Sequence, residues 1–358
     1  MELQPRTSTL DVEATVRERY SGAAHSREQA LCCPVTYDSR YLDAIPKEVL
    51  ERDYGCGDPS RYIHPGETVL DLGSGGGKIC FIAAQIVGPK GCVIGIDMNQ
   101  EMLELAQRSA PRVAERIGYS NVSFHRARIQ DLKLDLDSLD RWLSENPVHS
   151  ASDLSALEDF AERRRATAPL VADGSVDIVV SNCVLNLVRP EHKPQLIREI
   201  YRVLKRGGRI AISDIVSDRP VPEDLRADPE LWSGCISGAF QEQELLGALE
   251  DVGFYGVTVD RWEPVPFSVV QGIEFRAVTV TARKAHEGSR SEADQTVIYR
   301  GPWKRVEDDA GQVLRRGERV RVSPNAFQTL TSDPYAHDII PIEPAAAVTA
   351  AENKGCCS

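Results

Sequence analysis

The sequence holds nine cysteines, and their spacing limits the thiol chemistry open to them. No two of them form a Cys-x-x-Cys pair, so neither a zinc ribbon nor a thioredoxin-type motif is indicated. In a reducing compartment, cysteines are free thiols, metal ligands or redox centres rather than a disulfide framework. Because thiolates are soft ligands, a cluster of them would prefer a soft centre.

Three cysteines are candidates for such a cluster because we expect each in a loop at the active-site edge of a parallel sheet. Cys56 lies among glycines, and Cys183 and Cys235 each follow an apolar, strand-like run. The alternative for any single cysteine is a small buried hydrophobe. We adopt that interpretation for Cys80 and Cys92, which fall at core helix and strand positions.

A second chemical signal is the segment 71–77, Asp-Leu-Gly-Ser-Gly-Gly-Gly, at an expected strand-to-helix turn. Glycines let the backbone turn sharply and approach a ligand closely. Asp97 ends the next expected strand, where a carboxylate can accept hydrogen bonds from both hydroxyls of a ribose. A dinucleotide fingerprint would need glycine where Lys78 stands. The spacing Asp-x-Gly-x-Gly-x-Gly instead resembles the S-adenosylmethionine (SAM) loop of class I methyltransferases, which usually contact adenine where 129–131 stands here.

Alternating strand and helix patterns must position these residues. They predict an α/β fold, a doubly wound Rossmann-like class I methyltransferase sheet, with a loop-rich N-terminal cap and a small C-terminal β module. Two later runs, 256–262 and 275–281, should complete the sheet in antiparallel sense. The expected parallel strands are 68–72, 91–97, 121–126, 175–181 and 208–216, and the expected helices between them include 78–87, 99–116 and 194–204.

Composition shifts divide the chain into five expected segments. Residues 1–66 form the cap, beginning with an exposed helix of mixed charge over 1–20 and carrying Cys32, Cys33 and Cys56. The further segments are the SAM-binding core 67–217 with a surface-helix insertion at 133–170, a segment 218–284 that carries Cys235 and completes the sheet, a β-hairpin module 295–332, and a flexible tail 333–358 that contains Cys356 and Cys357.

The bulk properties limit the partners of the chain. A formal net charge of −12 argues against nucleic acid as a partner, because phosphate binding needs a basic face. No apolar run approaches the length that spans a bilayer, and the N-terminus lacks the apolar region of a signal peptide. We therefore expect a cytoplasmic protein with no membrane partner, acting as a monomer.

Together the motifs make the chain similar to the arsenite methyltransferases, from about residue 28 to residue 284. The insertion at 133–170 and the adjacent Cys32 and Cys33 depart from that family. The motifs that carry the resemblance are Tyr-Gly-Cys-Gly-x-Pro at 54–59, Asp-Leu-Gly-Ser-Gly at 71–75, Gly-x-Asp-Met at 95–98, Ser-Asn-Cys-Val-x-Asn-Leu at 181–187 and Leu-Trp-x-x-Cys-x-x-Gly-Ala at 231–239.

The resemblance implies SAM-dependent methylation of arsenite, or of its thiol conjugates, in arsenic detoxification. Cys56, Cys183 and Cys235 would hold As(III), and Cys32 or Cys33 would be the redox partner, with thioredoxin or glutathione as thiol reductant. The implied cofactor-binding residues are Tyr54, Asp71, Gly73, Ser74, Gly75, Asp97, Met98, Ile129 and Asn182.

Two further interpretations stay open from the residues alone. The chain could methylate a small organic molecule or another metalloid, with the cysteines incidental to catalysis. It could also be a thiol-rich metalloid-binding protein that keeps SAM only as a structural or regulatory ligand. Turnover of arsenite with SAM separates these possibilities.

Overall fold

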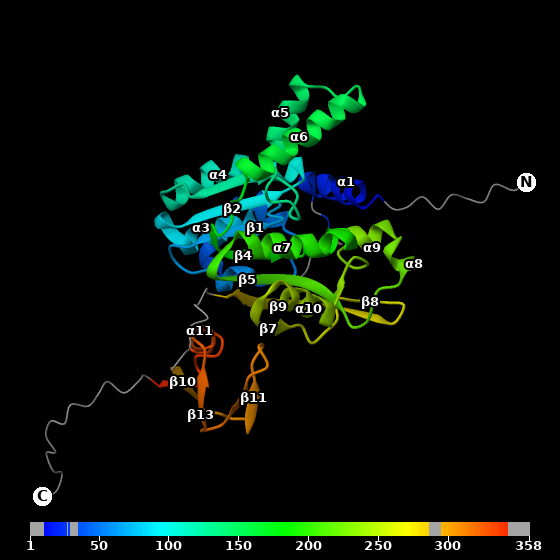
Figure 1. The fold of residues 1–358 in the computed structure, drawn as a ribbon. Helices are drawn as coiled ribbons and strands as arrows, with labels where there is room; N and C mark the ends of the chain where they lie inside the picture. The colour runs from blue at the N-terminus through cyan, green and yellow to red at the C-terminus, as the bar shows by residue number, and fades with distance from the viewer. Residues whose placement is uncertain (1–10, 27, 29–34, 286–294, 343–358) are drawn as a thin grey trace, which may run out of the picture. The chain divides into compact units, whose positions relative to one another are not determined.

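A computed structural model describes residues 11–26, 28, 35–285 and 295–342 (Figure 1). The chain divides into two compact units, residues 1–284 and residues 285–358. The first unit contains the large sheet and the candidate site residues that the structure describes, and the second is a small β-rich module. Each unit is considered by itself.

The first unit is built on one mixed sheet, ordered β3-β2-β1-β4-β5-β9-β7. The first five strands in that order run parallel, β9 runs antiparallel to β5, and β7 runs antiparallel to β9, as the sequence predicts. Short strands β6 and β8 pair with β5 and β9. The strands are β1 Thr68–Leu72, β2 Cys92–Asp97, β3 Val122–Arg126, β4 Val176–Asn182, β5 Leu204–Ser217, β6 Phe240–Gln241, β7 Phe254–Trp262, β8 Ser268–Val270 and β9 Ile273–Lys284.

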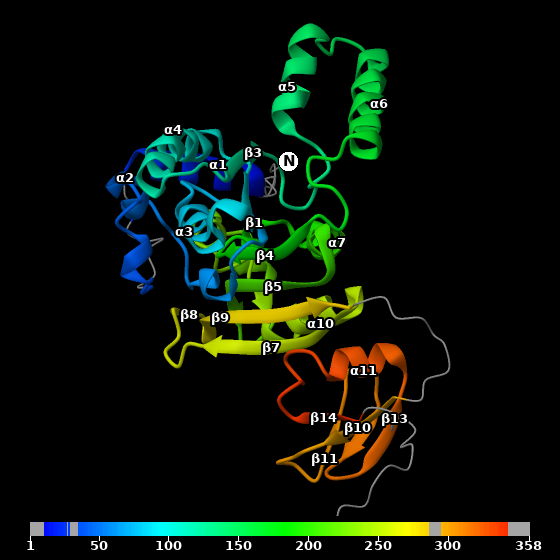
Figure 2. The ribbon, with the colours of Figure 1, turned by 90° about the vertical axis from the view of Figure 1, so that its left-hand side faces the viewer.

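Helices cover both faces of this sheet (Figure 2). α3 (Lys78–Val87) and α4 (Gln100–Ile117) bury one face with Phe81, Leu105 and their neighbours. α7 (Lys193–Val203) and α10 (Glu242–Val252) bury the other with Ile200, Leu249 and theirs. Since both faces are covered, the central strands are apolar on both sides.

A sharp turn joins β1 to α3 and brings the glycine segment to the carboxyl edge of the sheet. Gly77 caps α3 in the left-handed conformation, with φ 89°. A Cβ placed there would lie 2.8 Å from Cζ of Phe124. Glycine is therefore required at this point both by backbone conformation and by space.

The N-terminal helix is not the exposed helix expected over 1–20. The structure instead forms α1 over Val12–His25 and buries one side of it against the first unit. Val12 and Val16 pack with Trp232, and Ala23 and Ala24 pack with a second apolar cluster. Its mixed charge hid this apolar stripe in the sequence. The rest of the cap contains helix α2 (Lys47–Glu51) and short 3₁₀ turns at Ser39–Tyr41 and Pro59–Tyr62.

The expected insertion forms two surface helices, as the sequence predicts. α5 (Leu136–Glu145) and α6 (Ala151–Thr167) project together from the first unit (Figure 2). The rings of Trp142 and Phe160 stack between them, with centroids 5.0 Å apart. The remaining elements of this unit are α8 (Glu223–Arg226), α9 (Pro229–Ser233) and 3₁₀ turns at Gly88–Lys90, Leu185–Leu187 and Pro190–His192.

The second unit contains a hairpin, as the sequence predicts for the module 295–332. β11 (Arg305–Glu307) and β12 (Val313–Arg315) pair antiparallel there. A separate three-stranded sheet combines β10 (Gln295–Tyr299), β13 (Arg319–Val322) and β14 (Ile339–Ile342), with α11 (Pro324–Leu330) between the last two. The prediction of a flexible tail from residue 333 is wrong for β14, whose Ile339 is buried in the core of this module.

No helix in the described ranges combines the length and the apolar character that crossing a bilayer requires.

Candidate functional site

A cavity opens at the carboxyl ends of β1, β2 and β4, where a doubly wound fold binds its ligands. The structure brings all nine residues predicted to bind the cofactor into its lining, together with Cys183 and with Tyr20 of α1. Those nine are Tyr54, Asp71, Gly73, Ser74, Gly75, Asp97, Met98, Ile129 and Asn182.

Asp97 ends β2 and is held by backbone donors. Its Oδ2 accepts a hydrogen bond from the amide of Gly75 at 2.8 Å, and its Oδ1 accepts one from the amide of Asn99 at 2.8 Å. Burial raises the pKa of this carboxyl, and these backbone donors oppose the rise. A carboxylate accepts about four hydrogen bonds, so Asp97 keeps capacity for a ligand in the cavity.

Asp71 and Ser74 are buried polar residues in the same lining. Burial raises the pKa of Asp71 to about 7, and the Cys80 thiol, which donates to its Oδ2 at 3.2 Å, opposes that rise. Within the described residues, Oγ of Ser74 has no hydrogen-bond partner. An orphaned buried hydroxyl facing a cavity is the kind of group that a polar ligand would satisfy.

Two other sequence expectations meet different outcomes here. Cys80 is fully buried in α3, as expected. Cys92 is exposed, so its assignment as a buried residue is wrong. It is the first residue of β2, where the strand emerges from a surface turn.

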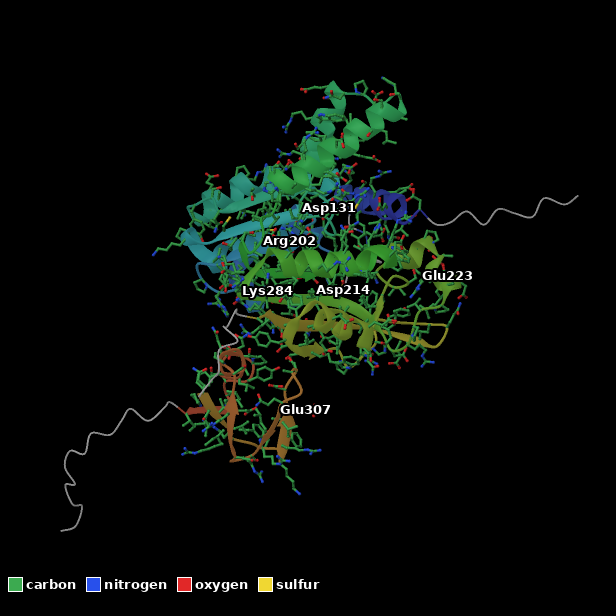
Figure 3. The ribbon with its side chains drawn as sticks, in the orientation of Figure 1. Asp131, Arg202, Asp214, Glu223, Lys284 and Glu307 are labelled. Carbon is green, nitrogen blue, oxygen red and sulfur yellow. A yellow bond between two sulfur atoms is a disulfide. The ribbon has the colours of Figure 1, made fainter. Side chains whose placement is uncertain are left out.

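The segment 129–131, expected at the adenine, is divided between two places. Ile129 and Gln130 line the cavity. Asp131 does not, because its carboxylate pairs with Arg165 of α6 at 2.9 Å and lies in a groove at the α5–α6 insertion. Figure 3 shows Asp131 on the side of that insertion, apart from Asp214.

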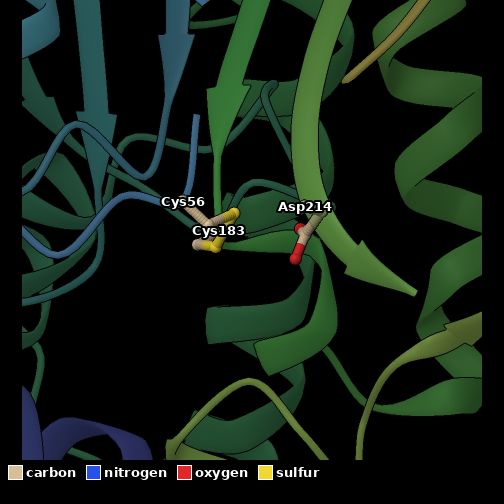
Figure 4. Close-up of side chains that lie close together, drawn as sticks. All are labelled: Cys56, Cys183 and Asp214. Carbon is tan, nitrogen blue, oxygen red and sulfur yellow. A yellow bond between two sulfur atoms is a disulfide. The ribbon is translucent and has the colours of Figure 1, made fainter. Parts of the chain in front are cut away.

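The three candidate ligand cysteines meet in one buried apolar cluster. Cys56, Cys183 and Cys235 are each less than 8% exposed. Cys56 and Cys183 form a disulfide, with Cα atoms 5.8 Å apart, which corrects the expectation that the cysteines are free (Figure 4). The fold brings two distant loops within bridging distance. The thiol of Cys235 donates to the carbonyl of Cys183 at 3.1 Å.

Asp214 of β5 lies beside the disulfide, and the sequence analysis missed it (Figure 4). A carboxylate oxygen and the sulfurs of Cys56 and Cys183 all lie within 4.8 Å of one another. Its Oδ2 accepts from the amides of Val184 and Leu185 at 3.2 and 2.9 Å, and burial raises its pKa to about 6. An aspartate inside the mainly apolar run 210–216 of β5 was the available signal.

Two asparagines flank Cys183 and fix the loops that carry the other cysteines. Oδ1 of Asn182 accepts from the amides of Cys56 and Gly57 at 2.8 and 3.0 Å, so this residue also holds the Cys56 loop. Nδ2 of Asn186 donates to the carbonyl of Cys235 at 3.2 Å. The role of Asn186 depends on a contact 49 residues along the chain, which sequence spacing does not reveal.

Two of the cysteines occupy a backbone conformation that usually favours glycine. Cys183 has φ 59° and Cys235 has φ 62°. A left-handed conformation costs an ordinary L-residue about 1–2 kcal/mol. The surrounding hydrogen bonds, including those to Asp214 and Asn186, therefore hold these turns against their local preference.

Tyr20 extends from α1 into the space between the cavity and the cysteines. Its hydroxyl lies 3.9 Å from Sγ of Cys235, and its ring meets Tyr54 edge to face with centroids 6.2 Å apart. Burial raises the pKa of Tyr20 well above its ordinary value, so the phenol stays protonated. Sequence reasoning missed it, because it predicted α1 to be exposed.

Four cysteines of the sequence analysis lie outside the described residues: Cys32, Cys33, Cys356 and Cys357. Their expected roles therefore remain predictions.

Each unit matches a known family model. The family described as "Methyltransferase domain" matches residues 63–165 and 159–253. A domain of unknown function matches residues 286–358. The first match covers β1 through α10 and includes the cavity residues that the sheet contributes, but not Tyr20 or Tyr54.

Curated relatives of the chain are arsenite methyltransferases. The protein of Halobacterium salinarum is 35% identical, over 68% of this chain and 57% of its own length, so the chain spans less than two thirds of that relative. The protein of Aquipseudomonas alcaligenes is 33% identical, over 73% and 67%. The mouse protein is 30% identical, over 85% and 74%.

A solved structure agrees with these relatives. The arsenic(III) S-adenosylmethionine methyltransferase of Chlamydomonas reinhardtii superposes with a TM-score of 0.58 at 26% identity, covering 90% of this chain and 98% of that one. With this fold and these relatives, the chain is a SAM-dependent methyltransferase and belongs to the arsenite methyltransferase family.

Proposed function

We propose that this chain transfers a methyl group from SAM to trivalent arsenic bound by the thiolates of Cys56, Cys183 and Cys235. The observation that carries the proposal is their convergence in one buried cluster whose member Cys183 also lines the cavity at the carboxyl ends of β1, β2 and β4. A substrate held by these sulfurs would lie next to a cofactor in that cavity. Its biological role would be arsenic detoxification.

The cavity suits SAM in the chemistry of its donors and acceptors. Asp97 would accept hydrogen bonds from the ribose hydroxyls, and the unpartnered Ser74 hydroxyl would pair with a polar group of the ligand. Ile129 and Met98 offer apolar surface for adenine. When bound, SAM supplies an electrophilic methyl group on a sulfonium.

Three thiolates explain why the site needs no general base for the transfer itself. They are soft ligands and would hold arsenic in a pyramid with its lone pair free to attack the methyl group. That lone pair carries no proton. The work of the protein is then to align the nucleophile, the methyl group and the leaving sulfur in a site that excludes water.

The disulfide must open before this site can bind arsenic. Cys56 and Cys183 are oxidised in the structure, and a disulfide sulfur is not a thiolate ligand. Two electrons and two protons from an external thiol reductant, such as thioredoxin or glutathione, would return both thiols by exchange. Methyl transfer leaves arsenic formally pentavalent, so two electrons must return to it before a further attack. We propose that Cys32 or Cys33 supplies them by forming a disulfide with a binding cysteine, which the external reductant then resolves.

The direct test incubates the purified chain with arsenite, SAM and a thiol reductant and identifies the arsenic products by chromatography with mass-spectrometric detection. We expect methylated arsenicals from the wild type and none from Cys183→Ser. Cys92→Ser is the matched control, because that cysteine is exposed and distant from the cluster along the chain. Methylation by Cys183→Ser would refute the metalloid site and favour an organic or other substrate.

The redox proposal has its own variant. Replacing Cys32 and Cys33 together by serine should leave As(III) binding intact and stop turnover of arsenite. The variant should still methylate a monomethylated trivalent substrate supplied in reduced form. Arsenite turnover at the wild-type rate would show that the cap cysteines have no redox role.

A further inference from the structure

A second cavity lies on the α7–α10 side of the sheet and shares no lining residue with the cofactor cavity. Its volume is about 740 Å³, within the range of small-molecule sites. One wall is the segment 238–240, which begins three residues after Cys235. Its charged lining residues are Lys193, Arg198, Arg226, Glu244 and Asp251.

Lys193 gives this cavity an unusual buried charge. The residue is only 8% exposed, and its ammonium donates to the carbonyl of Gly238 at 2.6 Å and lies 3.9 Å from the centre of the Phe240 ring. Among the described residues, no carboxylate comes within ion-pair distance of it. Buried lysines are normally paired, because an isolated buried charge is costly.

Two arginines add positive charge to the same lining. Within the described ranges, the guanidinium groups of Arg198 and Arg226 have neither a hydrogen bond nor an ion pair. Burial lowers the pKa of Lys193 to about 8; the charge of Asp214 opposes that lowering, Arg226 adds to it, and Glu244 opposes it. With Glu244 and Asp251 in the same lining, the three cations leave a local excess of positive charge in a chain of net charge −12.

We propose that this cavity binds a small organic anion, with its carboxylate groups on Lys193, Arg198 and Arg226. Each contact would be a charge-assisted hydrogen bond. Glu244 and Asp251 in the same lining would take an ammonium group of that ligand. Phe240 and Ile197 supply apolar surface for its carbon skeleton. The chemistry that fits is a zwitterionic, multiply carboxylated molecule the size of a short peptide.

The ligand would also contact the segment 238–240, which is hydrogen-bonded to the loop that carries Cys235. Lys193 holds the carbonyl of Gly238, and the amide of Phe240 donates to Oδ1 of Asn186 at 3.3 Å. The same asparagine donates to the carbonyl of Cys235. Occupancy should therefore rigidify the segment 236–241. This site does not depend on the proposed methylation, since it is tested without arsenic.

Titration calorimetry with S-methylglutathione tests the site in the full chain. This probe carries two carboxylates and one ammonium, and its blocked sulfur cannot exchange with the disulfide. We expect binding that Lys193→Met and Arg226→Gln each weaken tenfold or more. Arg112→Gln, an exposed arginine on α4, is the matched control and should bind as the wild type does. SAM binding by each variant shows that the fold is retained.

Hydrogen exchange with and without the probe locates the contact. Protection over 236–241 is expected, and protection confined to other segments would overturn the proposal. Equal affinity of the wild type, Lys193→Met and Arg226→Gln for the probe, or no binding by the wild type, would overturn it as well. Inorganic phosphate is a second probe: competition with S-methylglutathione supports the cation cluster as the anchor and shows that it accepts a free oxyanion.

Discussion

The carboxylates around the cofactor cavity differ in the hydrogen-bonding capacity that they keep for a ligand. Asp97 faces the cavity and uses its oxygens on backbone amides, whereas Asp131 faces away and is neutralised by Arg165. A position next to the glycine segment is thus not sufficient for ligand binding. The partner that each carboxylate already has decides whether it can serve the cofactor.

We therefore predict that Asp97→Ala weakens SAM binding tenfold or more, about 1.4 kcal/mol. The lost acceptor would leave ribose hydroxyls unpaired in a buried site. Calorimetry on the reduced protein measures the change, and As(III) affinity should be unaltered. Asp131→Ala is the control and should keep wild-type SAM affinity. An unchanged affinity in Asp97→Ala would remove this residue from the cofactor site.

Asp71 predicts how SAM binding depends on pH. Its pKa is raised to about 7 by burial, so the carboxyl is largely neutral below pH 6 and ionised above pH 8. SAM carries a sulfonium and an ammonium, and a cation binds better beside the ionised form. SAM affinity should therefore rise as the pH increases through about 7. Asp71→Asn should flatten that rise, and a profile equal to the wild type's would contradict the assignment.

At the scale of elements, α1 links the cofactor cavity to the cysteine cluster. Arg19 donates to the carbonyl of Glu230 and to Oγ of Ser233, both at 2.9 Å, and Ser21 donates to Glu101 at 2.8 Å. The helix thus bridges α9 and α4 and carries Tyr20 between the two sites. Its position is fixed by polar contacts as well as by its apolar stripe.

Arg19→Ala should loosen this bridge. We expect faster amide exchange over 12–25 and SAM affinity lowered severalfold, because the helix lines the cavity. Arg40→Ala removes a surface ion pair with Asp38 and a contact with the Tyr41 ring, and should change neither quantity. If exchange over α1 stayed at the wild-type rate, the Arg19 contacts would not be what holds the helix.

The sequence predicted the helices and strands better than the contacts between distant side chains. The run 68–72 coincides with β1, because an apolar run followed by glycines has a clear local meaning. The residues that line the cavity could also be predicted, since the carboxyl ends of parallel strands lie at one edge of the sheet. The disulfide, Asp214 and Asn186 could not be predicted, because their roles arise from contacts between distant loops. The predicted burial of Cys92 was wrong, because an apolar strand pattern does not reveal which end of the strand is exposed to solvent.

At the scale of the whole molecule, the two compact units suggest a division of function. The described site residues all lie in the first unit, which ends at Lys284. The second unit has its own buried core, which includes Val297, Tyr299 and Ile339. The match of residues 286–358 to a separate domain family agrees with this division.

A chain ending at residue 284 should therefore fold and bind SAM with wild-type affinity. The large sheet is complete at β9, and its core needs no residue of the second unit. Thermal unfolding and SAM calorimetry of the shortened chain measure this. Aggregation, or a loss of SAM affinity, would show instead that the module is needed to stabilise the first unit.

At Cys235 the left-handed backbone favours glycine for stability, whereas the proposed function requires the thiol. Cys235→Gly and Cys235→Ala both remove the thiol, but only glycine relieves the strained backbone, and we expect it to be the more stable variant by roughly 1 kcal/mol. Chemical denaturation of the two variants measures the difference, and a more stable alanine variant would contradict it. Laboratory selection for heat tolerance alone would then favour glycine and discard the thiol that we propose as an arsenic ligand.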